Sequence, residues 1–236
     1  LQHYSGEQAL SYIGQFALMF LQYLTPATDL ACLAALARGL SGKVLMGNFY
    51  ADVMRATFLV LLPLCLVTAG MLVLGGVIMT FDGSVVAQTL EGAKQIIARG
   101  PVAAFVTIKQ LGTNGGGFFG VNSAHPYENP SAFTNIIEMT SLLLIPAACC
   151  FTSGIGVKNT KQGKAIFAAM LILLVVFTGI IAVNEHAGTP QLADGGAVNI
   201  EMTDGQAGGN MEGKESRFGI ATSSTWSAYT TAASNG

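Results

Sequence analysis

Apolar segments long enough to cross a membrane alternate with short polar linkers along this sequence of 236 residues. Ala56–Thr80 and Ala165–Asn184 carry no charged residue from end to end. Met139–Val157 is a third such segment, entered from Phe133, and Gln8–Ala37 is a fourth with more polar positions. A helix needs about 20 apolar residues to span the hydrocarbon of a bilayer. The pattern therefore predicts an all-α polytopic membrane protein with four spanning helices.

The first of these segments differs from the others because polar residues interrupt it: Gln15, Gln22, Thr25, Pro26, Thr28 and Asp29. They indicate a span that packs against protein or lines a wet path, with a buried helix of a soluble protein as the alternative. A carboxylate at membrane depth suggests a functional role. Asp29 is equally compatible with an ion pair to a neighbouring helix outside this sequence.

A shorter apolar stretch, Pro101–Leu111, is predicted to form a helix that enters the membrane without crossing it. Pro101 suits the first position of a helix, and Gly112 suits the position just past its end. A helix of this length measures roughly 16 Å, about half a bilayer. The chain must then return through the glycine-rich stretch 112–130, and irregular backbone at that depth is tolerated only inside protein or beside a wet cavity.

The chemistry of such a return favours a cation. The C-terminal end of the short helix is the negative end of its dipole, and glycines allow carbonyl groups to turn to one side. Rings of backbone carbonyls replace the hydration shell of potassium ions in known filters. The pattern occurs twice, because Phe218–Ala233 is a second short helix, followed by Ser234, Asn235 and Gly236 as the first is followed by Thr113, Asn114 and Gly115.

Counting the spans places the two glycine turns on one face of the membrane. Two full spans separate them, and an even number returns the chain to the side it left. Gln2 also lies two spans from Gly115, so the N-terminal edge belongs to the same face. The sequence therefore predicts that the turns meet around one axis and form a pore from repeated helix–dip–helix units.

The composition agrees with a membrane protein, and the positions of the basic residues predict its orientation. Of all residues 51% are hydrophobic and 10% are charged, whereas soluble domains carry about 25% charged residues. The net charge of −2 gives no basic surface for nucleic acid. The four cysteines lie in apolar stretches and are interpreted as core residues. Two linkers on the same side hold a dense set of basic residues, which predicts that this side is cytoplasmic: Arg38, Lys43, Arg55, Lys158, Lys161 and Lys164.

Other chemistries fit the glycine-rich stretch less well. A phosphate-binding loop would need a following lysine and a preceding strand, and both are missing around Gly115–Gly117. Ser123 and His125 suggest a membrane hydrolase, but no motif marks a third catalytic partner. Glu128 and His125 are interpreted as turn and vestibule residues, and Lys109 as a support for the C-terminal end of the short helix.

Four stretches carry a resemblance to a known family. "LGTNGGGFFGVNSAHPYENPSAFTN" (Leu111–Asn135) resembles the second filter region in the family of potassium-binding, channel-like subunits of bacterial Kdp potassium-uptake ATPases. "NMEGKESRFG" (Asn210–Gly219) is similar to the segment before that family's third pore helix. "LQHYSGEQ" (Leu1–Gln8) and "TTAASNG" (Thr230–Gly236) resemble the segments at its first and third filters.

The resemblance implies the fold of the potassium channel and transporter superfamily, with helix–re-entrant pore loop–helix repeats. Residues 1–47 are expected to hold the end of the first filter and its outgoing helix, 48–160 the complete second repeat, and 161–236 the third repeat up to its filter. It also implies a set of potassium ligands, mostly backbone carbonyls: Gln2, Thr113, Asn114, Gly115, Ser234, Asn235 and Gly236.

The same resemblance implies a bacterial inner-membrane protein that selects potassium from the outside for an ATP-driven pump. No catalytic residues, organic cofactor or nucleic-acid partner are expected on this chain, and ATP would be hydrolysed by a separate P-type ATPase subunit. A single-span stabilising peptide and a small peripheral subunit are the other expected partners, besides the lipid bilayer. A stand-alone potassium channel or cation symporter is the alternative.

Overall fold

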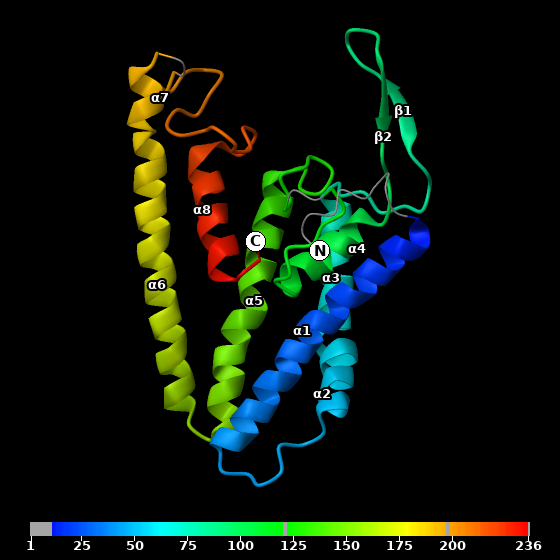
Figure 1. Cartoon of the computed structure of the whole chain (residues 1–236), viewed down its shortest axis with the longest axis vertical. Coiled ribbons are helices and arrows are strands. Elements are labelled where there is room, and N and C mark those ends of the chain that lie inside the picture. The colour runs from blue at the N-terminus through cyan, green and yellow to red at the C-terminus, as the bar shows by residue number, and fades with distance from the viewer. Residues whose placement is uncertain (1–10, 120–121, 197–198, 236) are drawn as a thin grey trace.

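Helices dominate the structure, a computed structural model that describes residues 11–119, 122–196 and 199–235. In Figure 1 the long helices run between the upper and lower halves, one of them obliquely, and most of the shorter elements lie in the upper half. The elements in chain order are α1 (Tyr12–Leu40), α2 (Phe49–Arg55), η1 (Ala56–Leu61), α3 (Leu62–Leu74), β1 (Val85–Gln88), β2 (Lys94–Ile97), α4 (Val102–Leu111), α5 (Ala132–Gly156), α6 (Thr160–Ala187), α7 (Pro190–Asp194) and α8 (Gly219–Ala232).

Four helices within the described residues are long and apolar enough to cross a membrane: Tyr12–Leu40, Phe49–Leu74, Ala132–Gly156 and Thr160–Ala187. The prediction of an all-α polytopic membrane protein with four spans is therefore confirmed. The second span begins and ends earlier than predicted. Asn48 caps its start by accepting a hydrogen bond from the Ala51 amide (3.1 Å), and Gly76, at φ 98°, takes the left-handed conformation that follows its end.

The second span is continuous from α2 through η1 to α3, and its middle turn widens into a π-helix at Ala56–Leu61. Pro63 lies in the first turn of α3, two positions after the π-helical turn, and has no backbone N–H to donate to the preceding turn. The Thr57 hydroxyl meanwhile donates to the Val53 carbonyl (2.9 Å). A π-turn inside a long helix is a usual way to absorb such an interruption of the hydrogen-bond ladder.

The short helix α4 lies in the centre of the structure and is almost entirely buried. Pro101 occupies the N-cap position and Gly112 the C-cap, so α4 begins one residue later than predicted and ends where expected. It contacts α1, α3 and α5. Phe105 packs edge-on against Phe118 with ring centroids 5.9 Å apart. Protein therefore encloses α4, as the membrane argument requires for a helix that does not cross.

The helices α5 and α6 form an antiparallel hairpin that turns at the lower end of Figure 1. Gly154 and Gly163 allow the two backbones to touch, because a Cβ placed on Gly163 would lie 2.6 Å from the Cys150 carbonyl oxygen and 3.0 Å from the Gly154 Cα. Farther up, α6 also packs along α8, which lies between α6 and α5 in Figure 1. The hairpin thus carries the chain across and back between the two short helices α4 and α8.

A feature that the sequence did not predict is the two-stranded antiparallel sheet of β1 and β2, in which Val85 pairs with Ile97 and Gln88 with Lys94. It projects at the upper right of Figure 1, away from the helices. Its two strands have four residues each and show little alternation of polar and apolar residues. The hairpin adds a small β element to an otherwise helical fold.

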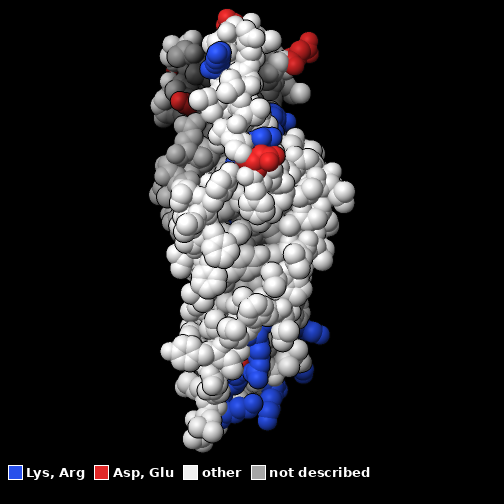
Figure 2. All heavy atoms as spheres, turned by 90° about the vertical axis from the view of Figure 1, so that its right-hand side faces the viewer, with Lys and Arg blue, Asp and Glu red and all other residues white. Residues whose placement is uncertain are grey.

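On the face that Figure 2 shows, charged side chains gather towards the two ends of the molecule and leave a band without charged residues between them. Basic residues dominate the lower end, whereas acidic and basic residues mix at the upper end. At the lower end Arg38 and Arg55 both pair with Asp52, with Nη2 of Arg38 3.0 Å from Oδ1. This separation is typical of a protein that spans a membrane.

The cysteines are all free, and the expectation that each is a core residue holds only in part. Cys65 and Cys150 are buried and Cys149 is half-buried, but Cys32 is exposed on α1. Asp29, three positions earlier, is exposed as well and makes no hydrogen bond or ion pair with another described residue. The sequence of α1 is more polar than that of a helix surrounded by lipid, and these two exposed residues account for part of that.

Candidate functional site

The two short helices α4 and α8 end in the same way. After α4, the Asn114 amide reaches back to the Lys109 carbonyl (3.3 Å), and after α8 the Asn235 amide reaches back to the Thr230 carbonyl (2.9 Å). The residue before each asparagine, Thr113 or Ser234, has a positive φ of 48° or 53°. This is the Schellman type of helix end, in which glycine normally takes the left-handed position.

Neither Thr113 nor Ser234 is a glycine, so both turns hold a conformation that L-residues rarely adopt. For a β-branched residue such as Thr113 the strain is of the order of 1–3 kcal/mol. Conformations of this kind persist where the surrounding structure over-determines them, and they concentrate at functional sites. The repeated strain at matching positions marks these two turns as the candidate site.

The two turns lie against each other. A Cβ placed on Gly115 would fall 1.8 Å from the backbone carbonyl oxygen of Asn235, so no side chain fits there. Gly115 itself has a φ of 72°, which favours glycine a second time. The prediction that two distant glycine turns meet is therefore confirmed for Gly115 and Asn235. Gln2 and Gly236, which belong to the predicted ligand set, lie outside the described residues.

The Asn114 side chain points into the protein and holds the turn together. Its Nδ2 donates to the carbonyl oxygens of Gln22 and Ile108 (3.3 Å each), and its Oδ1 accepts from the Gly116 amide (3.0 Å). Gln22 of α1 also packs against this segment, since its Nε2 lies 2.5 Å from where a Cβ of Gly116 would be. Because these hydrogen bonds occupy the side chain, Asn114 can offer a ligand only its main-chain carbonyl group.

Behind the first turn lies a buried ion pair between α4 and the loop that follows the glycines. Nζ of Lys109 is 3.0 Å from Oε2 of Glu128, and both side chains are 0% exposed. Oε1 of Glu128 accepts from the amides of Phe118 and Phe119 (2.7 and 2.9 Å), and Oε2 accepts from the Ser123 amide (3.0 Å). The carboxylate therefore fixes the backbone that returns from the turn.

The charge balance around Glu128 keeps it ionised. Burial by itself raises the pKa of Glu128, but the Lys109 ammonium and the amides of Phe119 and Ser123 outweigh burial and hold the pKa below its ordinary value. The interpretation of Glu128 as a vestibule residue is thus wrong, because the side chain is fully enclosed. Lys109, interpreted as a support for the C-terminal end of the short helix, ties that end to Glu128 and Ser123 of the following loop.

A second buried carboxylate, Glu138 of α5, completes this network. Its Oε2 accepts from Nε2 of Gln110 (2.8 Å) and from the Ser123 hydroxyl, while its Oε1 has no hydrogen-bond partner among the described residues. Because the Ser123 hydroxyl donates to Glu138, it is not poised to transfer its proton to a histidine. The ring of His125 instead stacks on Phe119 at 3.8 Å, and the arrangement does not support a hydrolase built on Ser123.

Sequence reasoning missed Glu138 and Gln110, although Glu138 left a signal. It is the one carboxylate within the apolar stretch of α5, and ionisable residues inside membrane spans are uncommon and tend to be functional. Gln110 gave no comparable signal, because a single glutamine near a helix end is ordinary. Its importance depends on partners 28 and 125 positions away in the sequence.

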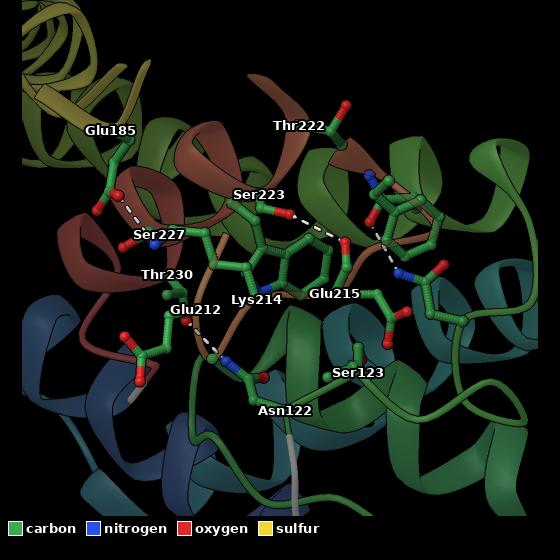
Figure 3. Close-up of a pocket in the computed structure, with 16 residues that line it drawn as sticks. Asn122, Ser123, Glu185, Glu212, Lys214, Glu215, Thr222, Ser223, Ser227 and Thr230 are labelled. Carbon is green, nitrogen blue, oxygen red and sulfur yellow. Dashed lines mark hydrogen bonds and ion pairs between the residues drawn. The ribbon is translucent and has the colours of Figure 1, made fainter. Parts of the chain in front are cut away.

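A cavity of about 400 Å³ lies between α8 and the loop that follows the first turn (Figure 3), and many of the residues that line it are polar. Asn122 and Thr230 meet at its floor, where Nδ2 of Asn122 donates to the Thr230 hydroxyl (2.9 Å). Farther out, Lys214 pairs with Glu185 (2.8 Å). Among the residues that line it, carboxylates outnumber the single lysine, so the cavity suits a cation better than an anion.

The comparisons with known proteins settle which family this site belongs to. Residues 1–236 match the family of the potassium-transporting ATPase A subunit. The chain belongs to this family. The resemblance inferred from four short stretches of sequence is thereby confirmed along the whole chain.

Individual relatives agree with the family match. The chain is 51% identical to the potassium-transporting ATPase potassium-binding subunit of Clostridium perfringens, over 100% of this chain and 43% of that protein. It is 50% identical to the protein of the same description from Pseudomonas aeruginosa, over 100% of this chain and 41% of that one. The chain therefore spans about two fifths of the length of these relatives.

Proposed function

We propose that this chain binds and conducts potassium ions as part of the potassium-binding subunit of an ATP-driven uptake complex. The observation that carries the proposal is the contact between Gly115 and the backbone carbonyl of Asn235. It joins two strained turns, each at the end of a buried or half-buried short helix, around one point. Family membership and the names of the relatives support potassium as the ion and ATP as the energy source.

The ligands in this proposal are main-chain oxygens of Thr113, Asn114, Gly115, Ser234 and Asn235, joined by Gly236 and Gln2. Thr113 and Ser234 take the left-handed conformation at equivalent places in the two turns, which supports equivalent roles for the residues that follow them. The negative ends of the α4 and α8 dipoles lie at the same turns and favour a cation. Potassium is thus the transported substrate, held by carbonyl groups in place of its water shell.

The likeness of the two turns supports a division of the chain into repeats. Residues 1–47 supply the end of one filter and an outgoing helix, 48–160 form a complete helix–pore–helix unit, and 161–236 form a third unit up to its filter. The chain lies in the bacterial inner membrane with its basic end in the cytoplasm. A single-span peptide and two further subunits, one small and peripheral and the other a P-type ATPase, complete the complex. ATP is hydrolysed on the ATPase subunit.

The test uses the full-length protein in its complex, with Gly115→Ser. A side chain at this position displaces the Asn235 carbonyl, so the potassium concentration at half-maximal transport rises by about tenfold or more, and discrimination against sodium falls. Gly42→Ser is the matched control, because Gly42 also has a positive φ (76°) but has open space around it. Unchanged affinity and selectivity in Gly115→Ser would overturn the proposal. Potassium transport by the purified protein without an ATPase would instead favour a stand-alone channel.

A further inference from the structure

The Gln110 side chain connects the buried carboxylate of Glu138 to the turn at Asn235. Its Nε2 donates to Oε2 of Glu138 (2.8 Å), and its Oε1 accepts from Nδ2 of Asn235 (2.9 Å). Gln110 and Glu138 are 0% exposed and Asn235 is 1% exposed. Three elements, α4, α5 and the end of α8, are thus joined through one amide group that water does not reach.

The hydrogen bonds that lead from Lys109 to Asn235 have a definite direction from donor to acceptor. The Lys109 ammonium only donates, so the Ser123 oxygen accepts from it and sends its own proton to Glu138. Oε2 of Glu138 accepts the Ser123 hydroxyl, and Gln110 turns its nitrogen toward the same oxygen. The carbonyl end of Gln110 then faces Asn235 and selects the nitrogen of that side chain as its partner.

The consequence appears at the second turn. With Nδ2 of Asn235 held by Gln110, Oδ1 points the other way and has no hydrogen-bond partner among the described residues. This oxygen lies 3.6 Å from the position of a Cβ on Gly115, at the point where the two turns meet. A buried acceptor without a partner costs free energy unless a ligand or water satisfies it.

We propose that Glu138 and Gln110 are positioning residues that present the side-chain oxygen of Asn235 to the potassium path. The ion then has one side-chain ligand besides the main-chain carbonyls. The inference rests on the proposed function and adds to it a specificity determinant behind the filter. Reversal of the Asn235 amide would place an N–H group beside the cation, so the chain of bonds from Lys109 to Asn235 excludes that orientation.

A reciprocal exchange tests the proposal in the full-length protein within its complex. Gln110→Glu alone places a second carboxylate against Glu138 and removes the donor between them. The double variant Gln110→Glu with Glu138→Gln exchanges donor and acceptor, keeps the total charge, and leaves an oxygen to accept from Asn235. Ser123 can serve both arrangements, because its hydroxyl donates to whichever side chain is the carboxylate.

Three quantities are measured: the potassium concentration at half-maximal transport, the maximal transport rate, and the preference for potassium over rubidium and sodium. Gln110→Glu is expected to raise that concentration by about tenfold or more, and the double variant to restore it to within about threefold of the unsubstituted protein. A merely structural role would lower the amount of assembled complex and leave half-saturation and ion preference unchanged.

The transport measurements on these variants either support or overturn the positioning role of Gln110 and Glu138. The inference is overturned if half-saturation and ion preference in Gln110→Glu equal those of the unsubstituted protein, or if the double variant is no better than the single one. If Gln110→Glu does not assemble, the isosteric Glu138→Gln decides through the same readouts, and unchanged values overturn the inference. Gly115→Ser is measured alongside, because unchanged affinity there would mean that the proposed function itself has failed.

Discussion

The Nζ atom of Lys109 lies 3.0 Å from a carboxylate oxygen of Glu128, and neither side chain reaches solvent. One partner comes from the last turn of α4 and the other from the loop 19 positions later. Because Glu128 also accepts amides of that loop, the ion pair fastens the end of the short helix to the backbone that returns from Gly115. The ion pair therefore stabilises the turn at Thr113–Gly115.

Removing one partner of this pair is expected to destabilise the protein strongly. Lys109→Met leaves Glu128 as an uncompensated buried charge, at a cost of about 3–5 kcal/mol. The double variant Lys109→Met with Glu128→Gln removes both charges and is expected to recover part of the loss. The measurement is the thermal unfolding midpoint of the detergent-solubilised full-length protein. A double variant less stable than Lys109→Met would contradict the ion-pair account.

The pH dependence of stability should report on the same carboxylate. The pKa of folded Glu128 lies below its ordinary value of 4.5, so its contribution to stability is fully present above that value. As the pH falls through the lower, folded pKa, the carboxylate is protonated and the contribution is lost. The gap in unfolding midpoint between the unsubstituted protein and Glu128→Gln is therefore expected to narrow in acid. A gap that stays constant or widens would show that Glu128 is not ionised in the folded protein.

Local patterns in the sequence predicted the long and short helices but not the hydrogen-bond network around Glu128 and Glu138. The length of α4 and the glycine after it were enough to predict a half-span, and the count of spans was enough to bring Gly115 and Asn235 together. The pairing of Lys109 with Glu128 depends on how the loop folds back in space, which periodicity does not encode. The β1–β2 hairpin was missed for a related reason, since its strands are short and lack a clear alternation.

The close approach of α5 and α6 gives a prediction about stability. A valine at Gly163 would push its Cβ into the Cys150 carbonyl, 2.6 Å away, and separate the two helices. We expect Gly163→Val to cost about 2 kcal/mol or more in the free energy of unfolding. Gly179→Val on the same helix is the control, because a Cβ at Gly179 meets nothing within 4 Å. Equal losses in the two variants would mean that β-branching in the helix, and not the helix contact, sets the cost.

The uneven charge at the two ends of the molecule predicts its orientation in the membrane. Lys161 lies at the basic end, beside the turn between α5 and α6, and Glu91 lies at the tip of the β1–β2 hairpin at the other end. Both positions are exposed, so each accepts a cysteine in a cysteine-free background without disturbing the core. In spheroplasts, a membrane-impermeant maleimide should label Glu91→Cys directly and Lys161→Cys only after permeabilisation, because clustered basic residues stay in the cytoplasm. The reverse result would mean that α4 and α8 enter the membrane from the cytoplasmic side, and a filter that takes potassium from outside the cell would then be excluded.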